Sequence, residues 1–271
     1  MLFKVIKFDD IYVIKMSKTL MGGPVFFVHA FCIDNLLIDT GFVDAKMHIR
    51  QFIEDHKVQQ IAITHHHEDH IGGNAEANKL GIIPLVPEEG LELIKHPHKL
   101  QWYRRITWGM PEPSEANTLS KTIQTAHFTF DVIHAPGHSH DHKVFYLKER
   151  GWLFLGDVFL SERLKYMRDD ESPNVMIETL HNLLKLDFDI IFDALRGPIK
   201  NGKIAIKNKL EFLEEKREQV TSLYNKGLSM RDITKQAFGN EGLMTMISFG
   251  HYSKINFTKS LLGITRYPIS T

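Results

Sequence analysis

Apolar and polar residues alternate in short runs over the first forty residues of the chain. The runs cover residues 3–6, 11–14 and 24–32, and Asp34-Asn35 marks a turn into residues 36–38. A period of two places successive side chains on opposite faces of a strand, and Asp and Asn are frequent in turns. The pattern therefore predicts that the chain begins with a set of strands.

The middle of the chain changes repeatedly between helix and strand patterns. Ile49, Phe52 and Ile53 recur at helical spacing within residues 44–56, and a β-branched run follows at residues 60–64. Asn74 is a candidate cap for a helix at residues 74–79. The other predicted elements are strands at 82–86, 128–134, 143–148, 152–155 and 188–192, and helices at 88–95 and 174–186. Residues 96–121 have no clear period and are predicted to form an irregular or partly helical insertion.

From residue 203 onwards the pattern is that of charged amphipathic helices. Ser229 and Ser253 are candidate caps within this region. The first two hundred residues instead repeat strands, helix, strand and helix in two halves. This order favours two sheets packed face to face with helices outside, although the pattern alone leaves several α/β folds open.

Composition and charge narrow the classes of function. The 271 residues are 43% hydrophobic and 24% charged, and 33 basic side chains balance 33 acidic ones. Such a chain is typical of a soluble globular protein and has no net field to attract nucleic acid, so a nucleic-acid partner is not expected. We find no signal-peptide pattern and no apolar run of the ~20 residues that span a bilayer. The single cysteine, Cys32, excludes an intrachain disulfide, and the expected location is the cytoplasm.

Histidine is the unusual feature, because eight of the 16 histidines lie within residues 65–70 and 134–142. Residues 64–73 read THHHEDHIGG, in which His65, His67, Asp69 and His70 form an H-x-H-x-D-H spacing. Imidazole suits zinc and iron, and a carboxylate adds a hard, charge-neutralising ligand. A solvated histidine-rich loop is the alternative interpretation. The strand before the motif and the Gly-Gly after it favour a metal site.

This motif resembles the signature of the metallo-β-lactamase superfamily, and further motifs extend the resemblance. It implies that His65 and His67 bind one metal and that Asp69 and His70 bind a second. Residues 134–139 (HAPGHS) and 155–157 (LGD) resemble later motifs of the family. They imply His138 as the last ligand of the first metal and Asp157 as a carboxylate shared by both metals. The resemblance also places Asp39, in residues 37–41 (LIDTG), beneath the metal loop as a hydrogen-bonding support.

The sequence departs from the family where a final histidine normally completes the second site. Arg196, in residues 192–198 (FDALRGP), stands at that position. A guanidinium group has no free lone pair and remains charged, so Arg196 cannot be a ligand. We expect a weaker second site, and Arg196 either binds an anionic part of the substrate or pairs with a site carboxylate. His142 and His251 are alternative donors that could fill the gap.

The resemblance implies a fold, a division of the chain and a chemistry. The fold is an α/β (α+β) class, four-layer αββα sandwich over residues 1–200, with a helical extension at residues 201–271 packed on it, as in glyoxalase II-like and lactonase-like members. His251 lies in a turn of that extension which could close over the site. The chemistry is attack of a metal-activated hydroxide, oriented by Asp69, on an ester, thioester, lactone or amide of a small-molecule substrate. Zinc is the expected metal, as one or two ions, with iron or manganese as alternatives.

Other functions of the same fold remain as alternatives. A metal-bearing binding protein with little turnover would account for Arg196. A phosphodiesterase or nuclease is disfavoured by the neutral charge, and a redox di-iron protein is disfavoured because such members carry Glu where His67 stands. The sequence leaves the substrate, the metal and the oligomeric state open.

Overall fold

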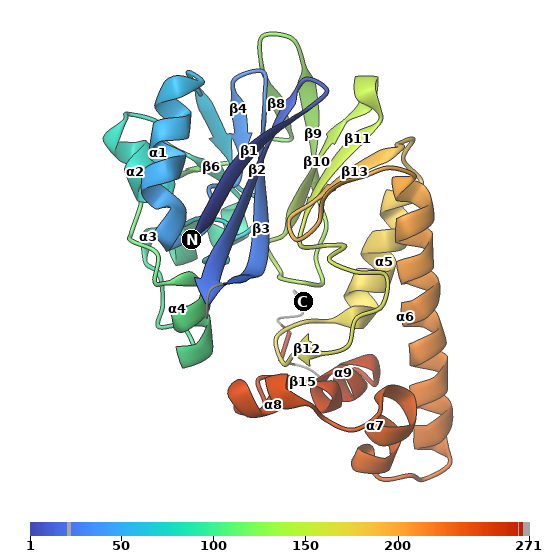
Figure 1. The fold of residues 1–271 in the computed structure, drawn as a ribbon. Coiled ribbons are helices and arrows are strands. Elements are labelled where there is room, and N and C mark those ends of the chain that lie inside the picture. Colours follow the sequence, from blue (N-terminus) through green and yellow to red (C-terminus); the bar gives the residue numbers. More distant parts are fainter. Residues whose placement is uncertain (21–22, 265, 268–271) are drawn as a thin grey trace. The chain divides into compact units, whose positions relative to one another are not determined.

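The computed structural model describes residues 1–20, 23–264 and 266–267, which form two compact units (Figure 1). The sandwich unit comprises residues 1–134, 141–160 and 188–200. The helical unit comprises residues 135–140, 161–187 and the described residues from 201 onwards. Residues 135–140 and 161–187 thus pack with the C-terminal helices although they interrupt the sandwich unit in sequence. The two-domain division at residue 200 remains a prediction.

The first sheet of the sandwich unit contains seven strands in chain order. They are β1 (Leu2–Phe8), β2 (Ile11–Leu20), β3 (Gly23–Ile33), β4 (Leu36–Ile38), β5 (Gln60–Ala62), β6 (Leu85–Val86) and β7 (Asn117–Thr118). Pairing is antiparallel from β1 to β4 and parallel from β4 to β7. The carboxyl ends of β4 and β5 therefore meet at one edge, where residues 39–41 and 64–70 begin their loops.

The second sheet contains six strands in the order β14-β13-β11-β10-β9-β8. These are β8 (Thr122–Gln124), β9 (Thr129–His134), β10 (Lys143–Leu147), β11 (Trp152–Gly156), β13 (Ile190–Asp193) and β14 (Gly197–Ile199). The β11–β13 pair is parallel, and the other pairs are antiparallel. The residues after β11 and β13 consequently emerge on the same side of this sheet.

Alternation along the strands separates two hydrophobic cores within the sandwich unit. Ile11 and Val13 of β2 join a core with residues of the second sheet, whereas Ile14 and Met16 join the core that includes residues of the helix α1 (Lys46–Asp55). Between the sheets, aromatic rings make the contact: Phe31 of β3 meets Phe192 of β13 edge-on, with ring centroids 5.4 Å apart. The period of two in the sequence thus identifies which side chains fill each layer.

Three more helices belong to the sandwich unit: α2 (Asn74–Lys79), α3 (Leu91–Lys95) and α4 (Trp102–Trp108). The insertion at residues 96–121 is partly helical, as expected, because it contains α4. Two local predictions were wrong. Gly73, not Asn74, caps α2, and the amide oxygen of Asn74 instead accepts a hydrogen bond from the hydroxyl of Thr40. The strand expected at 82–86 shortens to β6, where Pro84 precedes it and lacks an N–H to donate.

The helical unit contains five helices and a small two-stranded sheet among its described residues. They are α5 (Pro173–Leu183), α6 (Gly202–Asn225), α7 (Met230–Phe238), α8 (Leu243–Ile247) and α9 (Lys254–Leu261), and β12 (Met167–Arg168) paired with β15 (Tyr252–Ser253). Ser229 and Ser253 cap their helices as predicted. No helix in the described part of the chain is long and apolar enough to cross a bilayer.

Candidate metal centre

The metal loop, residues 65–73, connects the end of β5 to α2. Gly72, near the end of this loop, has no room for a side chain. A Cβ on Gly72 would lie 2.3 Å from the carbonyl carbon of Phe42. The N–H of Gly72 donates to the carbonyl of Gly41 at 2.7 Å. The loop therefore lies directly against residues 41–42, which follow β4.

Asp39 supports this loop by hydrogen bonds, as the motif predicted. It follows β4 in the left-handed region, with φ of 62°. Its Oδ1 accepts from the backbone N–H of Thr64 at 2.8 Å, and its Oδ2 lies 2.7 Å from Nδ1 of His70. The Thr64 hydroxyl also donates to this carboxylate. One buried carboxylate thus fixes both the start of the loop and the ring of His70.

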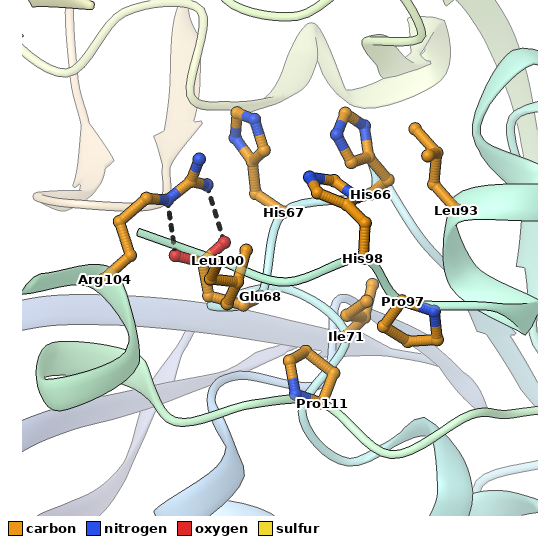
Figure 2. Close-up of a pocket in the computed structure, with 10 residues that line it drawn as sticks. All are labelled: His66, His67, Glu68, Ile71, Leu93, Pro97, His98, Leu100, Arg104 and Pro111. Carbon is orange, nitrogen blue, oxygen red and sulfur yellow. Dashed lines mark hydrogen bonds and ion pairs between the residues drawn. The ribbon is translucent and has the colours of Figure 1, made fainter. Parts of the chain in front are cut away.

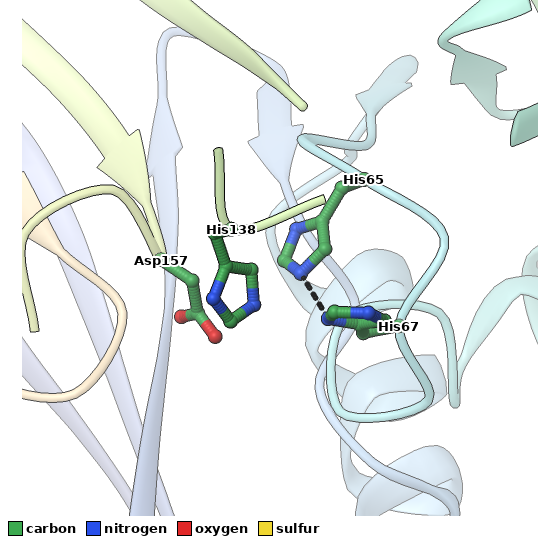
Figure 3. A group of neighbouring side chains, drawn as sticks. All are labelled: His65, His67, His138 and Asp157. Atoms are coloured by element: carbon green, nitrogen blue, oxygen red, sulfur yellow. Dashed lines mark hydrogen bonds between the residues drawn. The ribbon is translucent and has the colours of Figure 1, made fainter. Parts of the chain in front are cut away.

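His65, His67 and Asp157 converge in the sandwich unit (Figure 3). Their candidate ligand atoms all lie within 4.8 Å of one another, and Nε2 of His65 is 2.8 Å from Nδ1 of His67. All three side chains are buried. Two imidazole nitrogens and a carboxylate are the donor set that zinc and related divalent metals prefer. Figure 3 also draws His138, which belongs to the helical unit.

Asp69, His70 and Asp157 form a second group of ligand atoms within 4.8 Å of one another. Nε2 of His70 lies 3.4 Å from Oδ1 of Asp157 and 3.8 Å from Oδ2 of Asp69. This nitrogen is buried and has no hydrogen-bond partner in the part of the chain that the structure describes. A buried polar atom without a partner is costly, so its orientation towards two carboxylates fits a bound cation.

Charge repulsion and burial shift the pKa values in this group. Burial raises the pKa of Asp69 to about 6, and the nearby Asp157 carboxylate adds to the rise, while His70 opposes it. Burial would lower the pKa of His70, but Asp39, Asp157 and Asp69 raise it well above its usual value. The excess of carboxylates in a buried space requires positive charge there, which a proton on His70 or a metal ion would supply.

The backbone around Asp157 is positioned by His142. Gly156, at the end of β11, has φ of 50°, and a Cβ there would lie 2.8 Å from both Nε2 of His142 and Oγ1 of Thr64. The same Nε2 accepts a hydrogen bond from the N–H of Asp157 at 3.1 Å. That lone pair is therefore already used, so His142 does not supply it to the second metal group.

A buried ion pair borders the metal loop and was not found from the sequence. Figure 2 shows Arg104 of α4 facing both oxygens of Glu68, at 2.7 and 2.6 Å. The pair lines a pocket together with His66, His67, Ile71, Leu93, Pro97, His98, Leu100 and Pro111. Glu68 is consequently bound by a cation from the insertion, in agreement with its exclusion from the ligands.

His138 is held within the helical unit. Its Nδ1 lies 2.8 Å from Oε1 of Glu171, and both side chains are buried. Burial alone would raise the pKa of Glu171, but Arg168 and His138 lower it below its usual value. A carboxylate at one ring nitrogen is the usual support of a metal-binding histidine. No sequence motif identified Glu171.

Arg196 lies in the turn between β13 and β14, and its backbone N–H donates to Oδ1 of Asp193 at 2.8 Å. The guanidinium is exposed and its carbon lies 6.0 Å from the ring centroid of Phe159. Among the described residues it forms no ion pair, so the pairing with a site carboxylate that one interpretation expected is not observed. Its role towards substrate remains a prediction.

His251 lies in the helical unit, in the turn that precedes β15. Its Nε2 is 3.3 Å from Oδ1 of Asp169. Asp169, Asp170 and His251 form a third group of potential ligand atoms within 4.8 Å, but Arg266 pairs with Asp169 and Arg168 with Asp170. The two arginines already balance the carboxylates, which favours a structural role for this cluster. A contribution of His251 to the metal centre stays a prediction.

Comparison with known proteins identifies the family. Residues 23–192 match the family model described as Metallo-beta-lactamase superfamily. The chain belongs to the metallo-β-lactamase superfamily. The resemblance based on the histidine and aspartate motifs is therefore confirmed, and so is the predicted fold class of mixed sheets with helices.

Relatives and solved structures of this superfamily extend the match beyond the motifs. The chain is 27% identical over 195 residues to the atrochrysone carboxyl ACP thioesterase of Passalora fulva, covering 68% of this chain and 52% of that protein. It is 28% identical over 181 residues to the hydroxyacylglutathione hydrolase of Idiomarina loihiensis, covering 64% and 60%. The matched region thus spans little more than half of these relatives. A metallo-β-lactamase family protein from Thermus thermophilus shares the fold, with a TM-score of 0.67, 18% identity and coverage of 94% and 91%.

Proposed function

We propose that this chain is a metal-dependent hydrolase with two adjacent metal positions that share Asp157. The observation that carries the proposal is the presence of two groups of ligand atoms, from residues that are all buried except Asp69, with this carboxylate in common. The first position uses His65 and His67, and the second uses Asp69 and His70. Both the donor chemistry and the unpartnered Nε2 of His70 fit divalent cations, with zinc as the first candidate.

His138 is proposed as the remaining ligand of the first position. The sequence motif at residues 134–139 supports this role. The buried Glu171 carboxylate, 2.8 Å from Nδ1 of His138, supports it too, because metal-binding histidines usually have a carboxylate or carbonyl at the other ring nitrogen.

A bound metal would supply a water of lowered pKa and polarise the carbonyl oxygen of the substrate. The residues of the chain set the geometry for this chemistry. Asp39 and Thr64 fix the metal loop, and His142 fixes the backbone at Asp157. Asp69, whose side chain is 14% exposed, is proposed to orient the attacking water by accepting its proton.

The proposed substrate is a small molecule with a thioester or ester bond. The names of the relatives support this class, since one is a thioesterase and another a hydroxyacylglutathione hydrolase. A metal-activated hydroxide would attack lactones and amides in the same way, so the substrate screen described below includes both classes. The exposed Arg196 guanidinium is proposed to bind an anionic group of the substrate, because arginine pairs with carboxylate or phosphate in bidentate geometry.

The test combines metal analysis with a substrate screen. Purified protein, loaded with Zn²⁺, Mn²⁺ or Fe²⁺, is assayed on p-nitrophenyl esters, acyl thioesters, homoserine lactones, nitrocefin and phosphodiesters. We expect metal-dependent hydrolysis of a thioester or ester that is lost with chelator and restored by metal. Tight metal binding without any turnover would favour a binding protein, and turnover of phosphodiesters alone would favour a phosphodiesterase.

The replacement Arg196→His is expected to increase the affinity for the second metal by about tenfold or more. The substitution removes a fixed positive charge at the position where the family normally has its final histidine, and it supplies a neutral imidazole donor there. Calorimetric titration with Zn²⁺ should therefore show two unequal sites in the unmodified protein and more equal sites in the variant. Arg217→His, at a half-buried position on α6, is the matched control and should leave both affinities unchanged. Two equally tight sites in the unmodified protein would contradict this account of Arg196.

A further inference from the structure

The backbone around His138 is bound by α5 and the residue before it, within the helical unit. The N–H of Ser172, the cap of α5, donates to the carbonyl of Gly137 at 2.8 Å. Gly137 has φ of 128°, and a Cβ there would lie 2.8 Å from the backbone nitrogen of Met176. The loop therefore fits directly onto the first turn of this helix, which leaves little freedom for the position of His138.

The ring of His138 is oriented by a buried carboxylate. Nδ1 lies 2.8 Å from Oε1 of Glu171, whose residue is 5% exposed. Arg168 contacts both Glu171 and His138. Its Nη2 lies 3.4 Å from Oε1 of Glu171 and donates a hydrogen bond to the carbonyl of His138 at 3.1 Å. The backbone N–H of Arg168 donates to the other oxygen of Glu171 at 2.8 Å. Both the ring and the backbone of His138 are thus held by these two residues.

Tyr267, near the C-terminal end of the described chain, binds both sides of His138. Its hydroxyl accepts a hydrogen bond from the N–H of Gly137 at 3.0 Å and donates to the carbonyl of Ser139 at 3.2 Å. The tyrosine is buried, with 7% exposure. Its neighbour Arg266 donates its backbone N–H to the carbonyl of Asp169 at 3.0 Å, which ties this segment to the residues beside Glu171.

We infer that Glu171 and Tyr267 are positioning residues for His138, the proposed metal ligand of the helical unit. The inference rests on the proposed function. With Nδ1 facing Glu171, Nε2 is the ring nitrogen of His138 that would bind a metal, and the carboxylate increases the basicity of the imidazole. Tyr267 keeps the backbone of the loop in place. Through Tyr267, the C-terminal extension would thus position a proposed ligand without supplying one.

The first experiment is Glu171→Gln, which preserves the size of the side chain and a carbonyl oxygen for Nδ1 but removes the charge. We expect the affinity for Zn²⁺, measured by competition with a chromophoric chelator, to fall about 10–100-fold at the tighter position. The visible spectrum of the Co²⁺-loaded protein should change because it reports the ligand set and geometry. Circular dichroism of the metal-free protein verifies that the variant is folded.

The second experiment is Tyr267→Phe, which removes one hydroxyl and keeps the ring. A fall in Zn²⁺ affinity of about twofold to tenfold is expected from the loss of its hydrogen bonds. If Glu171→Gln does not fold, the Zn²⁺ affinity of Tyr267→Phe tests the positioning of His138 by itself. Glu218→Gln and Tyr224→Phe, at exposed positions on α6, are the matched controls and should bind Zn²⁺ like the unmodified protein.

Each outcome of these titrations has a defined meaning. If the unmodified protein does not bind Zn²⁺, the proposed function fails and the inference fails with it. If the unmodified protein binds Zn²⁺ tightly and both variants bind it equally tightly, the proposed function stands and the positioning role is overturned. A lower melting temperature of the metal-free variants with unchanged Zn²⁺ affinity would also overturn it, since that result indicates a purely structural role.

Discussion

His67→Ala is expected to abolish hydrolysis and to lower the metal content while the chain stays folded. His67 is buried in the metal loop, and its Nδ1 lies 2.8 Å from Nε2 of His65. Alanine removes one of the donors on which the first metal depends. Residues that only support a ligand already contribute about 10–100-fold to affinity or activity, so the loss of a ligand should reduce kcat/KM by more than about 100-fold.

The measurements are the metal content after dialysis, kcat/KM on the best substrate of the screen, and circular dichroism. The fold should persist, because the loop is fixed by Asp39 and by backbone hydrogen bonds such as that from Gly72 to Gly41. His181→Ala, on an exposed part of α5, is the control for a general effect of removing a histidine. Metal content and activity near those of the unmodified protein would refute the assignment of His67.

The candidate metal ligands could be selected from the sequence because they lie in short local motifs. His65, His67, Asp69 and His70 occur within six residues, and a loop after a strand brings them together wherever the fold is formed. The support by Asp39 could also be predicted, although it is 31 residues from His70, because it lies in a strand-turn motif of its own. Sequence analysis therefore predicted the clustering of these side chains where spacing and residue type are both specific.

Apart from Asp39, the buried contacts around the candidate ligands could not be predicted, since the partners are distant in the sequence and lie in no motif. Arg104 binds Glu68 from 36 residues away, and Tyr267 binds Gly137 from 130 residues away. An isolated glutamate, arginine or tyrosine is compatible with an exposed surface as well as with a buried contact. Only the folded chain distinguishes these cases, because burial and pairing are properties of the tertiary structure.

Short elements were missed for a related reason. Strands β7, β12 and β15 have two residues each, which is too short for any hydrophobic period to be recognised. The strand expected at residues 82–86 was too long because the apolar run includes Pro84, which cannot donate to a neighbouring strand. Hydrophobic patterns predict the layers of such a fold better than they predict its connections.

Asp157→Asn is expected to weaken both metal positions together, which no other single substitution in the site should do. Asp157 is common to both groups of ligand atoms, and its Oδ1 lies 3.4 Å from Nε2 of His70. The amide has nearly the same shape, so the change removes mainly the negative charge that would neutralise each cation. We expect the affinity for each ion to fall at least about tenfold, which corresponds to about 1.4 kcal/mol per site.

Titration with Zn²⁺ by calorimetry measures the two affinities, and metal content after dialysis provides an independent check. Asp131→Asn, at an exposed position on β9, is the matched control. The backbone of residue 157 should remain in place, because its N–H still donates to Nε2 of His142. If only one affinity falls, Asp157 serves one metal and is not shared. If neither affinity changes, Asp157 is only a turn residue after β11 and does not bind either metal ion.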